Sequence, residues 1–408
     1  MTQALLGIVL LTGIVLMLSA ALLLARRLLV PDRAIAIAVA VNGGAGFESR
    51  FGTKLLTALA ENGILLPAAC GGAGTCGLCR VRVTQGSPVA LPAETALLSR
   101  AERRSGLHLA CQLVLREPIA VEVAEALLTA QSFQCEVVEA RSLTPLIREI
   151  VLKAPSGVAE GIEAGAFVQV TAPPYELEFA AIAVPERFER AWVPLRRLRV
   201  ASHEPVSRAY SIASTPVDLA AGRIVLLIRL AGPPPDRPGV PPGIVSSWLF
   251  QLVPGDRVSA AGPFGSFRAQ DNAREMVLIG GGVGLAPLRA IVHDQLDARG
   301  TGRKIGFWYG ARSREDLLHA GEFEELAARH SNFRWTVALS EPRPGDDWEG
   351  PVGFVHAVLR EGFLRDHPSP EECEYYLCGP PLMIAAVMTA LREAGVPQER
   401  IFFDDFGS

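Results

Sequence analysis

The sequence has no excess of basic residues. Among its 408 residues, 39 Lys and Arg stand against 43 Asp and Glu, which gives a formal net charge of −4. Nucleic-acid binding relies on clustered Lys and Arg side chains that neutralise phosphates, and no domain-wide basic face stands out here. We therefore expect no nucleic acid among the partners of this protein.

Long apolar runs are equally scarce, since the chain has a single one. Residues 4–25 are 22 residues without a charge, which as a helix would span about 33 Å, the thickness of a bilayer core. A secretory signal peptide needs a positive segment before the run, and MTQ supplies none. Arg26, Arg27 and Arg33 follow instead, which favours a retained single-pass anchor in a bacterial inner membrane, with residues 30–408 in the cytoplasm. A buried soluble helix and a cleaved peptide are the alternatives.

Cysteine and histidine are also few. A cytoplasmic location disfavours structural disulfides among the seven cysteines, so we expect metal binding or redox chemistry. Cys135 and Cys373 have no partners in the sequence and are expected to be small core residues. The seven histidines show no pair at metal-ligand spacing, and His108, close to Cys111, is expected to be structural.

Four cysteines do form a metal-binding pattern. Cys70, Cys76, Cys79 and Cys111 are spaced C-x5-C-x2-C-x31-C, close to the plant-type [2Fe-2S] spacing with one extra residue. The glycines between them allow positive φ angles and aim backbone amides at the sulfurs. Structural zinc, the alternative, more often uses two paired knuckles. The pattern predicts a [2Fe-2S] cluster.

The distribution of periodic segments predicts four parts. Residues 31–130 combine alternating strands with one amphipathic helix, typical of a small α+β domain. Short β-type runs recur over residues 131–272 and predict an antiparallel barrel or sandwich. Strands alternate with helices over residues 273–408, which predicts a doubly wound parallel α/β domain. The apolar anchor, residues 1–30, completes the chain.

Two segments of the predicted barrel carry groups that a flavin nucleotide needs. In RAYSIAS, Arg208 suits a phosphate, Tyr210 offers a flat surface, and Ser211 and Ser214 offer hydroxyl groups. Taken alone, this segment would be interpreted as an ordinary strand.

The second of these segments is PPGIVSSWL. Gly243, Ser246 and Ser247 open a predicted helix there, and its N-terminal amides suit a pyrophosphate.

Two further segments predict a nucleotide site in the α/β part. MVLIGGGVGLAPLRA places Gly281, Gly282 and Gly284 between a strand and a helix, where backbone amides approach phosphates. In YYLCGPPLM, Cys378 ends a strand before two prolines, at the edge of the sheet where ligands bind. A buried structural cysteine is the alternative there.

In this order, the motifs resemble the ferredoxin-NADP reductase superfamily fused to a [2Fe-2S] ferredoxin. The landmarks are RAYSIAS, GPFGSF, GGGVGLAPLRA, FWYGARSREDLL and YLCGPPLMI. The chain is more closely similar to the flavin and iron-sulfur subunits of Na⁺-translocating NADH:quinone oxidoreductases, through the N-terminal helix, the cysteine loop, HEPVSRAYSIA, ALSEPRPGDDWEGPVGFVHAVL and the terminal IFFDDFGS. This resemblance covers essentially the whole chain.

The resemblance implies site residues in each module. Arg208, Tyr210 and Ser211 would hold FAD, and Ser246 with Ser247 would meet its pyrophosphate. Phe406 would cover the flavin until the nicotinamide displaces it. Gly281, Gly282 and Gly284 would approach the dinucleotide phosphates. The implied catalytic residues are Cys378, Phe406 and Ser211.

The coenzyme preference is argued from charge as well. NADP-dependent members of the superfamily carry Ser-Arg after the strand that here reads VALSEP, whereas this chain has Ser340 and Glu341. A carboxylate repels a 2′-phosphate and accepts a bond from a ribose hydroxyl. We therefore expect NADH, although Arg312 and Arg343 could lie nearby.

Together these features predict a membrane-anchored NADH dehydrogenase subunit. It would pass electrons from NADH through FAD and a [2Fe-2S] cluster to other membrane subunits of a respiratory complex, for Na⁺-coupled reduction of quinone. The alternatives are the reductase component of a membrane-associated oxygenase and a non-catalytic redox sensor.

Overall fold

The computed structural model describes residues 2–29, 35–44, 46–86, 89–234, 237 and 239–404. They form two compact units, one of residues 1–66 and 79–128 and the other of residues 67–78 and 129–408. The units therefore meet on both sides of the cysteine loop segment 67–78 and again after residue 128.

The N-terminal residues form one helix, α1 (Thr2–Leu29). The side chains described on it, at residues 10–22 and 24, are all exposed. Across the described residues, no helix reaches the length and hydropathy of a membrane span.

The rest of the first unit is a small mixed sheet with short helices, as the α+β pattern predicts. The strand order is β2-β1-β5-β3-β4, with β1 and β5 parallel. Leu55, Leu59 and Leu109 lie in its core with no exposed surface. The elements are β1 (Ala36–Val41), β2 (Phe47–Arg50), α2 (Leu55–Glu61), β3 (Arg80–Gln85), α3 (Pro92–Leu97), α4 (Arg100–Arg104), β4 (Leu107–Leu109) and β5 (Ile119–Glu122).

One predicted strand of this unit is shorter than its sequence suggests. The run GLHLACQLVL alternates over ten residues, but β4 ends at Leu109. The amide of Gln112 donates to the carbonyl of Leu109 at 2.8 Å and closes a turn. This turn presents Cys111, so the fourth predicted cluster ligand lies just outside a strand.

The second unit begins with the predicted antiparallel barrel. Its strand order is β11-β8-β13-β6-β7-β12, and an antiparallel bridge from Ile212 to Leu226 joins the outer two strands and closes the barrel. The strands are β6 (Gln131–Thr144), β7 (Ile147–Lys153), β8 (Phe167–Ala172), β11 (Val206–Ser211), β12 (Arg223–Arg229) and β13 (Arg257–Phe264).

Short helices and a hairpin accompany the barrel. Helix α7 (Ile244–Gln251) packs its buried Val245 and Leu249 into the barrel core, as the segment PPGIVSSWL predicts. The hairpin of β9 (Tyr175–Glu178) and β10 (Arg199–Ser202) is a separate two-stranded sheet that the sequence patterns did not indicate. The remaining helices are α5 (Glu189–Trp192) and α6 (Pro216–Ala220).

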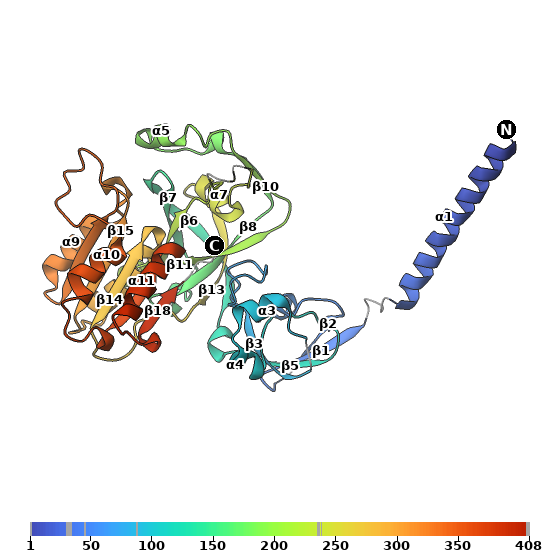
Figure 1. The fold of residues 1–408 in the computed structure, drawn as a ribbon, viewed down its shortest axis with the longest axis horizontal. Helices are drawn as coiled ribbons and strands as arrows, with labels where there is room; N and C mark the ends of the chain where they lie inside the picture. The colour runs from blue at the N-terminus through green and yellow to red at the C-terminus, as the bar shows by residue number, and fades with distance from the viewer. Residues whose placement is uncertain are drawn as a thin grey trace. The chain divides into compact units, whose positions relative to one another are not determined.

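The C-terminal part is a five-stranded parallel sheet in the order β16-β15-β14-β17-β18. Figure 1 labels β14, β15 and β18 of this sheet. Its strands are β14 (Met276–Gly281), β15 (Ile305–Ala311), β16 (Phe333–Leu339), β17 (Glu374–Cys378) and β18 (Ile401–Asp404). Its helices are α8 (Leu285–His293), α9 (Ala320–Arg329), α10 (Val355–Leu359) and α11 (Pro381–Glu393).

Side-chain alternation along the central strand explains the two helix layers. Met276 and Leu278 of β14 pack in the cluster that holds α8 and α9, whereas Val277 and Ile279 pack in the cluster that holds α10 and α11. The predicted doubly wound architecture is therefore confirmed. Strand order reverses beside β14, and ligands of such folds bind at the carboxyl ends of the strands at that point.

Candidate functional site

A cavity of about 1210 Å³ lies at the carboxyl ends of the parallel strands. Barrel residues and residues of the parallel sheet both line it, among them Tyr210, Ser211, Leu227, Gly282, Ser340 and Gly379. Pockets for one small ligand occupy roughly 300–1,000 Å³. The volume suits a site shared by a flavin and a dinucleotide.

The turn after β14 leaves little room for a side chain at two positions, and only at Gly284 is the close atom part of the backbone. A Cβ atom on Gly284 would lie 2.1 Å from the carbonyl oxygen of Cys378, and one on Gly281 would lie 2.8 Å from the Sδ of Met383. Gly282 has φ +55° and no described atom within 4 Å of its Cβ position, so its requirement is conformational. The three predicted phosphate-binding glycines line the cavity together.

Cys378 ends β17 directly behind this turn. Its side chain has no exposed surface and packs in the core cluster that also holds Leu285 and Tyr376. The neighbouring Gly379 and Pro380 line the cavity. The backbone of Cys378 thus lies at the carboxyl edge of the parallel sheet, where a ligand is predicted to bind, and its thiol is buried behind that edge.

The end of β11 meets the end of β18 at the cavity wall. Ser211 is 4% exposed and its Oγ donates a hydrogen bond to Oδ2 of Asp404 at 3.0 Å. Tyr210, beside it, also lines the cavity, and burial raises its pKa well above the ordinary value. Phe406, the third predicted catalytic residue, lies outside the described residues.

The hydroxyl groups predicted to bind FAD differ in what they contact. Ser214 Oγ donates to the carbonyl of Arg223 at 3.1 Å and accepts from the amide of Val225 at 2.8 Å, so it joins strands of the barrel. Ser246 Oγ donates to the carbonyl of Gly243 at 3.1 Å. Ser247 Oγ is buried with no hydrogen-bond partner among the described residues. Neither Ser246 nor Ser247 lines the large or the small cavity, so contact of these hydroxyl groups with a ligand stays a prediction.

Backbone amides surround the first cysteines of the predicted cluster loop. The Sγ atoms of Cys70 and Cys76 lie 3.3 Å apart. Burial alone would raise the pKa of Cys70, but hydrogen bonds from the amides of Thr75, Cys76 and Gly74 outweigh it and lower that pKa to about 6. Gly71, Gly72, Gly74 and Gly77 all have positive φ, as the sequence predicts for a loop that turns its amides towards sulfur.

The other two predicted ligands lie in the core of the first unit. Cys79 and Cys111 are each 1% exposed. A hydrogen bond from Cys79 lowers the pKa of Cys111 to about 6 against the effect of burial. Thiolate is the form of cysteine that binds iron, so the donor chemistry of both pairs fits a [2Fe-2S] cluster.

Within the second unit, the cysteine loop packs against strands β8 and β11 of the barrel. Gln169 Nε2 of β8 donates to the carbonyl of Ala68 at 3.0 Å. A small cavity of about 60 Å³ is lined by Ala69 and Leu78 of the loop together with Arg208, Ser211 and Asp404. The loop is therefore held beside the strand end that carries the Ser211–Asp404 hydrogen bond.

Glu341 has an ion-pair partner in Arg312. Their side chains are 3.2 Å apart and largely exposed, and the amide of Glu341 donates to the carbonyl of Arg312 at 2.7 Å. Arg343 pairs instead with Glu315. The two arginines that could have favoured a 2′-phosphate are thus both engaged with carboxylates.

A buried charge network between the barrel and the parallel sheet was not predicted. Glu322 of α9 accepts from Arg289 Nε at 2.7 Å and contacts His293 Nε2 at 2.5 Å and His319 Nδ1 at 3.0 Å. His319 also pairs with Glu149 of β7 at 2.9 Å and has a φ of 51°, rare for a residue with a side chain. His319 and Glu322 are only three residues apart, but the network as a whole joins three elements, β7, α8 and α9, that no local sequence signal links.

Three family models match the chain. They are the 2Fe-2S iron-sulfur cluster binding domain over residues 39–116, the oxidoreductase FAD-binding domain over residues 195–269 and the oxidoreductase NAD-binding domain over residues 278–389. Each falls on the part of the fold that carries the corresponding site.

Full-length relatives decide the family. The F subunit of the Na⁺-translocating NADH-quinone reductase of Yersinia enterocolitica is 42% identical over 99% of this chain and 100% of its own length. The F subunit of the same enzyme of Klebsiella pneumoniae is 44% identical over 87% of this chain and 88% of its own. The chain belongs to this family, the F subunits of Na⁺-translocating NADH-quinone reductases.

A solved structure shares its fold with this member of the F-subunit family. The crystal structure of the Amycolatopsis cytochrome P450 reductase GcoB has a TM-score of 0.65 and 31% identity, and covers 91% of this chain and 98% of its own. Reductases of oxygenase systems therefore share this fold, as the alternative prediction assumed. The near-complete match to the F-subunit family favours the first prediction.

The comparisons confirm the cofactors predicted for this F-subunit family member. A [2Fe-2S] cluster, FAD and NADH correspond to the three matched domains, and the chain is an oxidoreductase as predicted. Sequence reasoning missed Asp404 as a site residue. The terminal IFFDDFGS contains it, but only the fold shows that it contacts Ser211 and lines the small cavity.

Proposed function

We propose that this chain is the NADH-oxidising subunit of a membrane complex that reduces quinone in a Na⁺-coupled reaction. The observation that carries the proposal is the position of the Ser211–Asp404 hydrogen bond. Ser211 lines both the large nucleotide cavity and the small cavity beside the cysteine loop. When bound, FAD accepts an electron pair from NADH and releases electrons singly, which a [2Fe-2S] cluster can take up.

The chain's own residues would hold these groups as follows. Cys70, Cys76, Cys79 and Cys111 would ligate the cluster through thiolates. Arg208, Tyr210 and Ser211 would bind and cover FAD. Its pyrophosphate would meet the start of α7, with Gly243, Ser246 and Ser247; Ser214 remains a weaker candidate, because its hydroxyl already has two partners.

NADH would lie across the carboxyl ends of the parallel strands. Gly281, Gly282 and Gly284 would let the backbone approach its phosphates, and Glu341 would accept a bond from a ribose hydroxyl. Cys378 would lie behind the nicotinamide. Phe406 would cover the flavin and move aside when the nicotinamide arrives.

Asp404 gives this site a proton acceptor at a defined atom. Its Oδ2 already accepts the proton of the Ser211 hydroxyl, so the serine can take up a proton from a ligand while the carboxylate receives the serine's own. The pair would thus orient the flavin edge and accept a proton that leaves this edge when electrons pass on to the cluster.

We further propose that residues 4–25 anchor the chain in a bacterial inner membrane with the catalytic part in the cytoplasm. The supporting observation is the 28-residue helix α1, whose described leucines, such as Leu16 and Leu22, are 65% and 72% exposed. The domains would be 1–30, 31–130, 131–272 and 273–408. The partners would be further membrane subunits, which pass electrons on to quinone.

The test uses the complex from native membranes and the purified full chain. Electron paramagnetic resonance after NADH addition should show a reduced [2Fe-2S] signal in the chain, and the complex should reduce quinone faster with Na⁺. Copurification with an oxygenase and no Na⁺ response would overturn the pump assignment. Absence of NADH:ferricyanide activity after confirmed flavin loading would instead indicate a non-catalytic sensor.

A further inference from the structure

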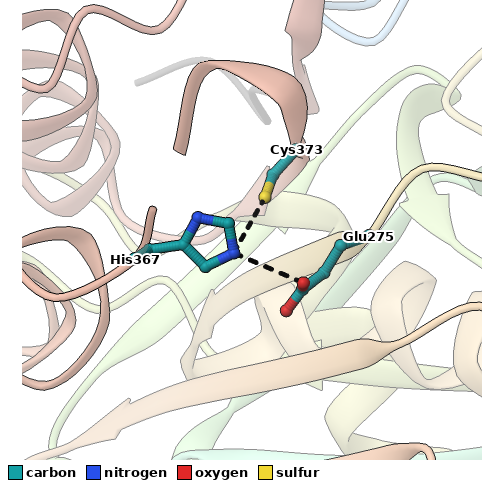
Figure 2. Close-up of side chains that lie close together, drawn as sticks. All are labelled: Glu275, His367 and Cys373. Atoms are coloured by element: carbon teal, nitrogen blue, oxygen red, sulfur yellow. Dashed lines mark hydrogen bonds and ion pairs between the residues drawn. The ribbon is translucent and has the colours of Figure 1, made fainter. Parts of the chain in front are cut away.

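Three metal-ligating side chains converge at the amino ends of two parallel strands. Glu275 directly precedes β14, Cys373 directly precedes β17, and His367 follows the helical segment Arg360–Leu364. Figure 2 shows the three side chains pointing towards one another. They lie at the opposite ends of these strands from Gly282 and Gly379, which line the nucleotide cavity.

The distances among the donor atoms suit a small tetrahedral ion. His367 Nε2 lies 3.4 Å from Glu275 Oε2 and 3.8 Å from Cys373 Sγ, and all three atoms lie within 4.8 Å of one another. Zinc bonds of about 2.0–2.1 Å to nitrogen or oxygen and about 2.3 Å to sulfur separate such donors by roughly 3.3–3.6 Å in a tetrahedron. The distances from His367 Nε2 to the other two donor atoms are therefore close to those in a tetrahedral zinc site.

The donor set and its surroundings favour a soft divalent cation. Thiolate and imidazole select zinc-like ions over magnesium or calcium. The carboxylates of Glu275, Glu371 and Glu372 all act on Cys373 with negative charge. The side chains of His367 and Glu275 are 18% and 23% exposed, so an ion can enter from solvent and a water molecule can fill the fourth position.

The ring of His367 is not yet in the form that binds a metal. Its Nδ1 accepts from the amide of Ser369 at 3.2 Å, so the neutral ring carries its proton on Nε2, which faces Glu275. A metal at Nε2 requires that proton on Nδ1, where it would meet the Ser369 N–H. Binding must therefore turn the Ser369 amide away, which lowers the affinity below that of a permanent structural site.

We propose that Glu275, His367 and Cys373 form a reversible site for one zinc-class divalent cation at the amino edge of the NAD-binding sheet. On binding, the Cys373 thiol releases its proton to solvent and becomes a thiolate ligand. The imidazole proton moves from Nε2 to Nδ1, and Glu275 binds as a carboxylate. The bound ion joins the start of β14 to the turn before β17, so it raises the unfolding temperature of the sheet.

The test is zinc titration of the full chain loaded with FAD and its iron-sulfur cluster. Equilibrium dialysis against Zn²⁺ should add one zinc per chain at unchanged iron content. Zinc X-ray absorption should show one sulfur ligand at about 2.3 Å and nitrogen or oxygen ligands at about 2.0 Å. Cys373→Ser and His367→Gln should each weaken binding by at least about tenfold.

A matched control is Cys135→Ser, which removes another buried lone thiol from the barrel core and should leave zinc binding unchanged. Zinc uptake equal in Cys373→Ser and the parent chain, a bound zinc without a sulfur ligand, or loss of iron in step with zinc uptake would each overturn the proposal. Zinc-free NADH:ferricyanide turnover, measured on the same samples, reports on the proposed function separately.

Discussion

Replacing Glu322 by glutamine should loosen the junction between the barrel and the parallel sheet. The carboxylate of Glu322 forms hydrogen bonds with Arg289 at 2.7 Å, His293 at 2.5 Å and His319 at 3.0 Å. Burial by itself would raise its pKa, but these partners hold that pKa well below its usual range. Glutamine keeps the shape and removes the charge, which leaves Arg289 without its main counterion.

The size of the effect follows from burial. Removing one partner of a buried ion pair costs about 3–5 kcal/mol. The Glu322 side chain is 24% exposed, and glutamine still accepts one hydrogen bond, so we expect the lower end, about 3 kcal/mol. For a body of this size, each kcal/mol shifts the unfolding temperature by about 2 °C, which gives a decrease of about 6 °C.

The same network predicts a pH dependence with a definite sign. Burial alone would lower the pKa of His319, but Glu149 and Glu322 raise it above its ordinary 6.5. Its contribution to stability is therefore complete below pH 6.5 and is lost as the pH rises through the folded value. Burial alone would raise the pKa of Glu149, but His319 and Arg141 lower it to about 2. Its contribution to stability is therefore complete above pH 4.5 and is lost as the pH falls towards 2.

The assay is thermal unfolding of the flavin-loaded chain, followed by flavin fluorescence from about pH 5 to about pH 8. The control is Glu324→Gln, an exposed position on the same helix, which should stay within about 0.5 kcal/mol of the parent. The difference between the parent and Glu322→Gln should shrink towards alkaline pH. A decrease no larger than that of the control, or one independent of pH, would refute the reasoning.

Three further substitutions test the site. Gly284→Ala puts a Cβ 2.1 Å from a backbone carbonyl oxygen and should lower the free energy of unfolding, measured by denaturant titration, by about 3 kcal/mol or more. Gly282→Ala places its Cβ in open space and should lower it by about 1–2 kcal/mol. Equal losses would contradict the packing argument. Asp404→Asn should slow reoxidation of the reduced flavin, followed by stopped flow after NADH addition, by roughly 100-fold at unchanged FAD content. An unchanged rate would remove Asp404 from the proton path. Glu341→Gln removes the charge that repels a 2′-phosphate and should raise the NADPH:NADH ratio of kcat/KM by about tenfold, and an unchanged ratio would show that other groups select the coenzyme.

The sequence was sufficient for features that depend on a few neighbouring residues. The spacing of Cys70, Cys76 and Cys79 already predicts a cluster loop, because iron ligands on one loop need a short, glycine-rich chain between them. The glycine turn at Gly282 could also be predicted from neighbouring residues, since its φ of +55° is unfavourable for most residues other than glycine. The barrel and the parallel sheet follow from strand periodicity and from the alternation of strands with helices.

The sequence was insufficient where function depends on what a residue touches. Ser214 is predicted to contact the flavin together with Ser211. It lies beyond the end of β11, and only the fold shows that its hydroxyl already bonds to backbone groups of β12. Cys373 was expected to be a plain core residue. It is 2% exposed, yet it faces His367 and Glu275.

What the sequence alone determined is the set of modules, their order and the local turns that expose amides and thiols. Tertiary structure alone decided the pairs that join distant segments: Ser211 with Asp404, 193 residues apart, Glu149 with His319, and Glu275 with Cys373. A local motif can be predicted from the sequence because the few residues between its members limit its geometry. Strand order sets Glu275 beside Cys373, because β14 and β17 are neighbours in one sheet. The packing of the barrel against the parallel sheet sets the other two pairs, irrespective of distance along the chain.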